Sequence, residues 1–153
     1  MSPRSRTNQL LYQAELLVGL PVGDDEHSPA RRMAIEESAL ALFELALGSL
    51  LKEVTEHARL NSHDWRELLA SDGPDVAELQ RLRDAMQQPE SWLYWLVGQL
   101  EKLHSDDGAA RRAVQNPSMI AVGSQLTLAE QLLENLQAAK RDIASLRETS
   151  QEW

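Results

Sequence analysis

The sequence predicts an all-α protein, a single-domain helical bundle over residues 1–153 with about four main helices and two shorter ones. Leu, Ala, Glu and Gln are abundant and aromatic residues make up only 5% of the chain, a composition that favours helices over strands. Apolar residues recur at spacings of three and four in several long segments, which is the period of an amphipathic helix. A length of 153 residues with 42% apolar residues suits one domain that has its own core.

The first predicted helix runs from about Ser5 or Thr7 to Leu20, where Pro21 and Gly23 end it. One arc of this helix is expected to face the core because apolar residues and one threonine share it. The arc consists of Thr7, Leu10, Leu11, Ala14, Leu17 and Val18.

The second predicted helix is the longest and is expected to form the centre of the bundle. Ser28 caps it, Pro29 occupies its first turn, and no helix-breaking residue follows before about Leu60. Gly48 lies inside this helix and Gly98 inside a later one, which indicates that neighbouring helices cross closely at both positions. The arc that faces the core holds Ile35, Ala39, Leu42, Phe43, Ala46, Leu47, Leu50, Val54 and Ala58.

Two shorter helices and two further main helices complete the predicted bundle. The shorter helices cover 64–70 and 75–87, and a main helix covers 89 to about 104. The last helix opens with a capping box formed by Thr127 and Glu130, or else begins earlier, at Pro117. The residues expected to face the core are Trp92, Leu93, Leu96, Leu100 and Leu103 in the third main helix and Ala129, Leu132, Leu136, Ala139, Ile143 and Leu146 in the last.

The charge balance and the lack of cysteine exclude several classes of function. Fifteen basic residues against 24 acidic ones give a formal net charge of -9, which repels polyanions, so we expect no nucleic-acid partner. No apolar stretch approaches the length of a membrane span, so we expect no membrane partner. A chain without cysteine has no disulfide, thiolate nucleophile or zinc-thiolate site, and it suits the reducing cytoplasm. We expect no resident cofactor.

Four groups of short segments, spread over most of the chain, carry a family resemblance. They are Arg6-Thr7-Asn8-Gln9 with Leu11-Tyr12 and Ala14, the long helix from Ala39 to Val54, Pro89-Glu90-Ser91-Trp92-Leu93, and Leu146-Arg147 with Glu152-Trp153. Together they resemble a family of small uncharacterised bacterial all-helical proteins, a domain of unknown function. The resemblance implies a bacterial source and a helical fold, and it supplies no active site.

Glu53 and His57 are the most unusual residues of the long predicted helix, because the helical pattern places both near the centre of its apolar arc. Residues four apart are neighbours on a helix surface. A carboxylate and an imidazole placed there could bind a metal or a ligand, with His104 or Tyr12 completing the site. The alternative is a hydrogen-bonded structural pair near the end of the bundle.

Two further patterns were compared with known chemistry. Glu101 and His104 form a Glu-x-x-His on one helix, the spacing by which carboxylate-bridged di-iron bundles present two ligands. Such a site needs a second Glu-x-x-His and two further inward Glu residues, which the sequence does not offer, so no di-iron site is predicted. Arg59 and His63 are comparable to the motif of the HEPN ribonucleases, helical bundles that place an Arg shortly before a His. The spacing here is shorter than in that motif, and a helix end and a loop explain both residues.

Large aromatic side chains are better indications of function than these patterns. Tyr94 and Trp95 lie on the polar side of their predicted helix, where the shorter helices could also cover them, and Trp153 ends the sequence given. Exposed aromatics mark protein interfaces more often than catalytic sites. We therefore expect a non-enzymatic helical interaction or scaffolding module with a protein partner or self-association. The alternative is a sensor or enzyme with a ligand or metal site near Glu53 and His57, and a third reading is a HEPN-like ribonuclease.

Overall fold

The computed structural model describes residues 1–110 and 126–150. In these residues the helices are α1 (Pro3–Val18), α2 (Ser28–Thr55), the 3-10 helix η1 (Glu56–Ala58), α3 (Trp65–Leu68), α4 (Ala77–Met86), α5 (Trp92–Leu103) and α7 (Leu128–Ser150). The described residues include no strand, and none of their helices has the length and apolar character needed to cross a membrane. The predicted all-helical bundle, with four main helices and two shorter ones, is confirmed.

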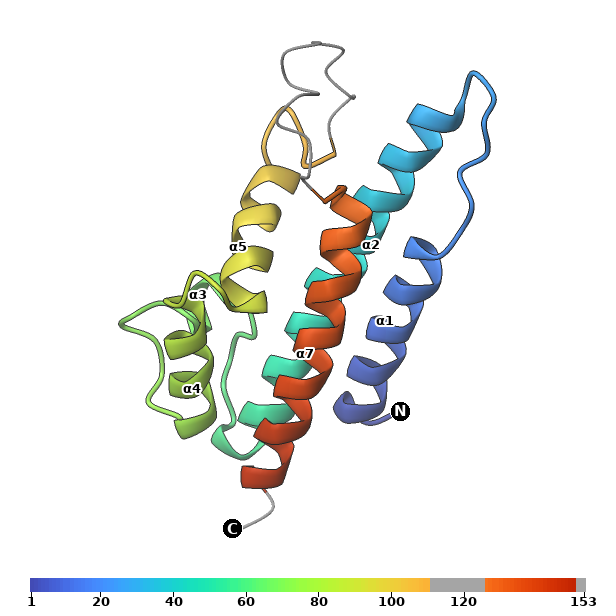
Figure 1. Ribbon diagram of the computed structural model, residues 1–153. Helices are drawn as coiled ribbons and strands as arrows, with labels where there is room; N and C mark the ends of the chain where they lie inside the picture. Colours follow the sequence, from blue (N-terminus) through green and yellow to red (C-terminus); the bar gives the residue numbers. More distant parts are fainter. Residues whose placement is uncertain (111–125, 151–153) are drawn as a thin grey trace.

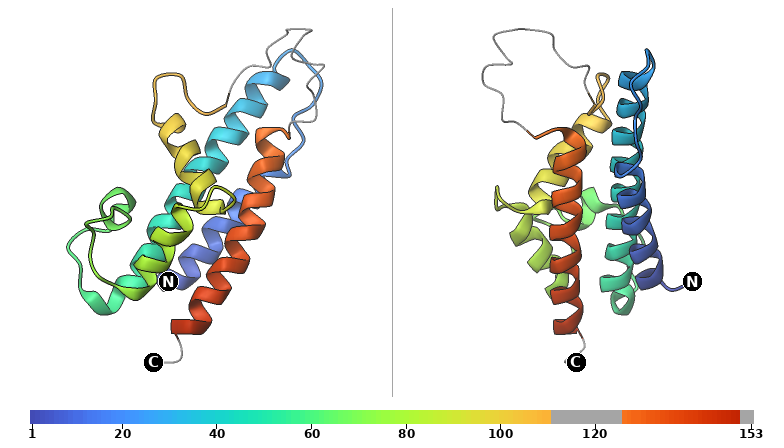
Figure 2. Two further views of the ribbon diagram at one scale, coloured as in Figure 1. Left: turned by 60° about the vertical axis from the view of Figure 1, so that its left-hand side comes forward. Right: turned by 45° about the vertical axis from the view of Figure 1, so that its right-hand side comes forward.

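The four main helices form two pairs (Figure 1). α1 and α2 run antiparallel as one pair, and α5 and α7 form the other, as the right-hand view of Figure 2 shows. α2 packs against α1, α5 and α7, and α1 also contacts α7. The short helices α3 and α4 lie beside α2 and α5 at one side of the bundle.

One hydrophobic core joins all of these helices, and much of it was predicted from the sequence. Thr7, Leu10, Leu11 and Ala14 of α1 are buried, as is the α7 seam from Leu132 to Leu146. Phe43 of α2 stacks on Trp92 of α5 with ring centroids 5.9 Å apart and an interplanar angle of 7°. The indole Nε1 of Trp92 donates a hydrogen bond to Oδ2 of Asp142 on α7 (2.8 Å). This stack therefore connects three of the four main helices.

α2 buries more of its surface than the predicted arc. Leu40, Leu51 and Thr55 lie outside that arc, and each is fully buried. The reason is that α2 is surrounded by neighbours on several sides, whereas a helix on the outside of a bundle buries only one stripe.

The end of α2 differs from the prediction. The helix was expected to continue to about Leu60, but it ends at Thr55, and η1 follows. The Thr55 hydroxyl donates back to the carbonyl of Leu51 (2.5 Å), and Arg59 then adopts a left-handed conformation with φ of 50°. L residues rarely adopt this conformation, so the sequence carries no signal for the turn.

The interior glycines do not have the predicted role. A Cβ atom built on Gly48 or Gly98 would meet no atom within 4 Å, so neither glycine is required for a close helix crossing in the described part of the chain.

Because glycine costs helix stability through backbone entropy, we expect Gly48→Ala to raise the free energy of unfolding by about 0.5–1 kcal/mol, as measured by urea unfolding. Gly108→Ala is the contrast, since Gly108 has φ of 74° and its Cβ would lie 2.7 Å from Oε1 of Glu37. We expect that variant to be less stable than the wild type, and a destabilised Gly48→Ala variant would contradict this explanation.

Candidate functional site

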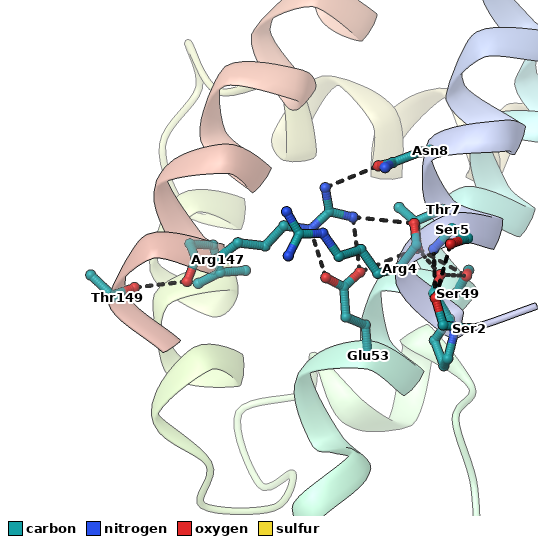
Figure 3. Close-up of polar contacts among 11 residues, drawn as sticks. Ser2, Arg4, Ser5, Thr7, Asn8, Ser49, Glu53, Arg147 and Thr149 are labelled. Atoms are coloured by element: carbon teal, nitrogen blue, oxygen red, sulfur yellow. Dashed lines mark hydrogen bonds and ion pairs between the residues drawn. The ribbon is translucent and has the colours of Figure 1, made fainter. Parts of the chain in front are cut away.

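A largely buried polar cluster joins α1, α2 and α7 near one end of the bundle (Figure 3). Arg147 of α7 donates from Nε to Oε1 of Glu53 on α2 (2.6 Å) and from Nη2 to Oε2 of the same carboxylate (3.1 Å). Its Nη1 donates to Oδ1 of Asn8 on α1 (2.9 Å). The Glu53 and Arg147 side chains are only 14% and 15% exposed. A two-point ion pair in such surroundings fixes the relative position of the helices that carry it.

Two buried hydroxyl groups extend the cluster to the first turn of α1. The Thr7 Oγ1 lies 2.9 Å from Oγ of Ser49 and 3.4 Å from Oε2 of Glu53. Both hydroxyl oxygens are also 2.9 Å from the carbonyl oxygen of Pro3. Each buried oxygen thus has a partner inside the protein, as buried polar groups need.

The cluster is built to hold helices together. Both oxygens of Glu53 accept from Arg147, and three guanidinium nitrogens of Arg147 already donate within the protein. These contacts engage both oxygens of the Glu53 carboxylate with a residue of another helix. The sequence does contain a signal for Arg147. Arg147 directly follows Leu146 at the edge of the buried seam, and a glutamate on a core face needs a cationic partner.

The structure places Glu53 and His57 in the lining of one open groove but puts His104 elsewhere, beside Glu44. Because α2 ends at Thr55, His57 lies exposed in η1, and no hydrogen bond joins it to Glu53 in the described residues. The Nε2 of His104 lies instead 2.9 and 3.0 Å from the two carboxylate oxygens of Glu44. Glu44 precedes Glu53 by nine residues, which is about 13 Å along a helix. Tyr12, the other candidate to complete the site, is 58% exposed on α1.

The Glu44 carboxylate is the centre of a second, smaller polar cluster. Besides His104, it accepts a hydrogen bond from Nε1 of Trp65 in α3 (2.9 Å). This contact attaches the short helix α3 to α2, and His104 attaches the end of α5 to the same carboxylate. Both partners of Glu44 thus come from elements that pack against α2.

An open groove of about 720 Å³ lies beside His57. Its polar lining comes from Glu53, His57, Asp75 and Glu78. Within residues 1–110 and 126–150, however, no three histidine or acidic side chains are grouped closely enough to hold a metal ion. Arg59 and His63, the pair compared with the ribonuclease motif, both lie in the connection between η1 and α3 and not on a helix.

The aromatic side chains proposed as an interface lie in different surroundings. Tyr94 is 50% exposed on α5. Trp95 is half-buried, and its indole Nε1 donates to Oε1 of Gln131 on α7 (3.0 Å), so α7 covers part of this ring. Trp153 lies outside the described residues.

A row of apolar side chains lies on the outer face of α1. Tyr12, Leu16 and Leu20 are 58%, 52% and 52% exposed. Their spacing of four residues places them along one side of the helix, opposite the buried arc. Leu20 follows the last helical residue, but its amide donates to the carbonyl of Leu17 (3.1 Å), so the chain still turns as a helix there. These three side chains are called the outer α1 row below.

Comparison with known proteins places the chain in a family. A model of a family of unknown function, DUF6586, matches residues 1–153. The chain belongs to this family. No curated protein and no solved structure matches the chain. The resemblance seen in the sequence to a family of uncharacterised helical proteins is thereby confirmed, and the candidate sites of this DUF6586 chain follow from its own structure.

A second buried carboxylate of the DUF6586 chain, that of Glu36, predicts a stability that depends on pH. The Glu36 side chain is 6% exposed, with its Oε1 3.3 Å from Nε of Arg32. Burial raises the pKa of Glu36, Arg32 lowers it in part, and Glu37 adds to the rise. The folded protein therefore holds this proton more tightly than the unfolded chain does. The contribution of Glu36 to the free energy of unfolding therefore falls as the pH rises from the ordinary pKa range of a glutamate through the raised pKa.

Replacement of Glu36 by Gln should remove this dependence, because the amide is neutral at every pH. We expect Glu36→Gln to unfold at a higher temperature than the wild type at about pH 7 and at nearly the same temperature at about pH 4. Thermal unfolding at both pH values measures the difference. The same difference at both values would show that Glu36 does not titrate in this way.

Proposed function

We propose that this protein is a helical interaction module that binds another protein molecule through the outer face of α1. The observation that carries the proposal is the outer α1 row, in which Tyr12, Leu16 and Leu20 expose more than half of their surface. Exposed apolar side chains that stand singly are ordinary on protein surfaces, but adjacent ones in a line are typical of contact surfaces. Tyr12, at one end of the row, also suits a binding hot spot, because tyrosine is enriched among such residues.

The polar clusters support a binding role over a catalytic one. Glu53 and Arg147 form an ion pair, and the Glu44 carboxylate contacts the side chains of Trp65 and His104. Their geometry connects helices and gives α1 a fixed position on α2 and α7. A rigid helix presents an apolar row with little loss of conformational entropy on binding, which favours association.

Site-specific photo-crosslinking in the cell that makes the protein tests this function. A benzophenone amino acid takes the place of Leu16 in one variant and of Glu101, an exposed residue of α5, in the control. We expect discrete crosslinked protein species from position 16 and none of the same mass from position 101. Equal labelling from both positions, or none from position 16, would contradict the proposed function.

We further propose a bacterial source and a cytoplasmic location. The resemblance to small bacterial helical proteins supports the source, and a chain that needs no disulfide suits a reducing compartment. Fractionation of the producing cell tests the location, and recovery of the protein in the membrane or outside the cell would contradict it.

A further inference from the structure

The two ends of the outer α1 row carry opposite charge. Arg4 and Arg6 lie in the first turns of α1, and Asp24, Asp25 and Glu26 lie in the connection that follows Leu20. Figure 1 shows this connection continuing beyond the C-terminal end of α1, at the opposite end from the N-terminus. The row is therefore bounded by a basic end and an acidic end.

The basic end has no explanation within the fold. The first turn of a helix favours acidic side chains because of the helix dipole, yet that of α1 has none and carries Arg4. In the described part of the chain neither Arg4 nor Arg6 forms an ion pair, and Arg6 only donates from Nη1 to Oε1 of Gln9 (2.5 Å).

The acidic end, in contrast, precedes α2, and acidic residues are favourable at the N-terminal end of a helix. Asp25 also pairs with Arg31 in α2. The acidic residues thus contribute within their own chain, while the two arginines of α1 remain available to an acidic surface from outside.

We propose that the protein bound by the outer α1 row is a second copy of this chain, with the two α1 helices antiparallel about a two-fold axis near Leu16. This inference rests on the proposed function, since it names the partner of the same surface. A two-fold axis brings each surface against itself. Leu16 then meets the partner's Leu16, and Tyr12 meets the partner's Leu20, because these residues lie four positions on either side of the centre.

Charge selects the antiparallel arrangement. Arg6 lies about 15 Å before Leu16 along α1, and Glu26 lies beyond Leu20 in the connection to α2, so an antiparallel arrangement turns the basic end of one copy towards the acidic end of the other. A parallel arrangement would place the arginines of the two copies together and the acidic residues together, and like charges across an interface oppose binding. The contact is small, so we expect a dimer of about micromolar affinity that weakens as salt is added.

A charge exchange tests the predicted pairing of the ends. We expect Arg6→Glu alone and Glu26→Arg alone each to weaken dimerisation about tenfold, because each change alters two symmetry-related contacts. An equal mixture of the two variants should dimerise as well as the wild type, since every contact between them again joins opposite charges. Sedimentation equilibrium measures all three samples. A mixture that associates no better than either variant alone would contradict the pairing.

Cysteine crosslinking of the purified protein distinguishes the two arrangements directly, because residues 1–153 contain no cysteine. The variants are Tyr12→Cys, Leu16→Cys and Leu20→Cys, each oxidised alone, and Tyr12→Cys mixed with Leu20→Cys. Circular dichroism first confirms that each variant is folded, which is expected at exposed positions. The antiparallel dimer predicts a disulfide-linked dimer from Leu16→Cys and a mixed dimer from the Tyr12→Cys and Leu20→Cys pair. It predicts little dimer from Tyr12→Cys alone.

The remaining outcomes separate the inference from the proposed function. Efficient crosslinking of Tyr12→Cys and of Leu20→Cys each with itself would overturn the antiparallel arrangement. If no pair crosslinks, while photo-crosslinking from position 16 in cells captures a different protein, self-association is wrong and the interaction module stands. If neither experiment yields a crosslink, both proposals are wrong.

Discussion

Replacement of Glu53 by Ala is expected to lower the free energy of unfolding by about 3 kcal/mol. The change leaves the guanidinium of Arg147 largely buried without its carboxylate partner, and an unpaired charge in such surroundings is strongly unfavourable. It also removes a hydrogen-bond partner of Thr7. Urea unfolding followed by circular dichroism measures the loss.

The controls separate the ion pair from the pair suggested by the sequence. We expect Arg147→Ala to be about as destabilising as Glu53→Ala, and the double variant to lose clearly less than the sum of the two. His57→Ala should change the free energy of unfolding by less than about 0.5 kcal/mol, because His57 is exposed. If Glu53→Ala and His57→Ala lowered the free energy of unfolding equally, the result would contradict this account and favour a site formed by Glu53 and His57 together.

Replacement of Trp92 by Ala is expected to destabilise the fold by about 4 kcal/mol. Trp92 is 3% exposed, stacks on Phe43 and donates to Asp142, so its removal opens a cavity where α2, α5 and α7 meet. Thermal and urea unfolding measure the loss, which should be among the largest of any single substitution in this chain.

Two further variants separate the contributions of the ring and of the hydrogen bond to the effect of Trp92→Ala. Trp92→Phe keeps a ring against Phe43 and removes the hydrogen bond to Asp142, so we expect a loss of about 1–2 kcal/mol. Tyr94→Ala removes a neighbouring aromatic side chain that is half exposed, and we expect it to be nearly neutral in the monomer. A Trp92→Ala loss no larger than that of Tyr94→Ala would contradict the role given to the stack.

The fold could be predicted from the sequence, because the helices of the bundle follow from hydrophobic patterns that are visible in the sequence. The spacing of Leu132, Leu136 and Ile143 predicts one apolar side of a helix, and these side chains are buried in the core. Thr127 was correctly identified as a cap, since its Oγ1 accepts from the Glu130 amide (3.1 Å). The end of α2 was not predictable, because it depends on Arg59 adopting a conformation that its residue type disfavours.

The candidate sites were harder to predict because they depend on residues distant in sequence. Glu53 was singled out for its place on an apolar arc, but its partner is 94 residues away, whereas a local pattern suggested His57. The outer α1 row does not follow from the sequence, because the hydrophobic pattern of a helix predicts its buried arc. The row has the same four-residue spacing, displaced to the opposite side of the helix, and only the structure shows that nothing in the described chain buries it.

Native mass spectrometry of the purified wild type and Leu16→Asp tests the central proposal, that the protein acts by association through α1. We expect the wild type to appear at the mass of the polypeptide and at twice that mass, in proportions that depend on concentration. Leu16→Asp should give the monomer alone. A bound metal or small molecule at fixed stoichiometry in both proteins, lost on replacement of His57, would contradict the claim and move the function to the groove beside that residue.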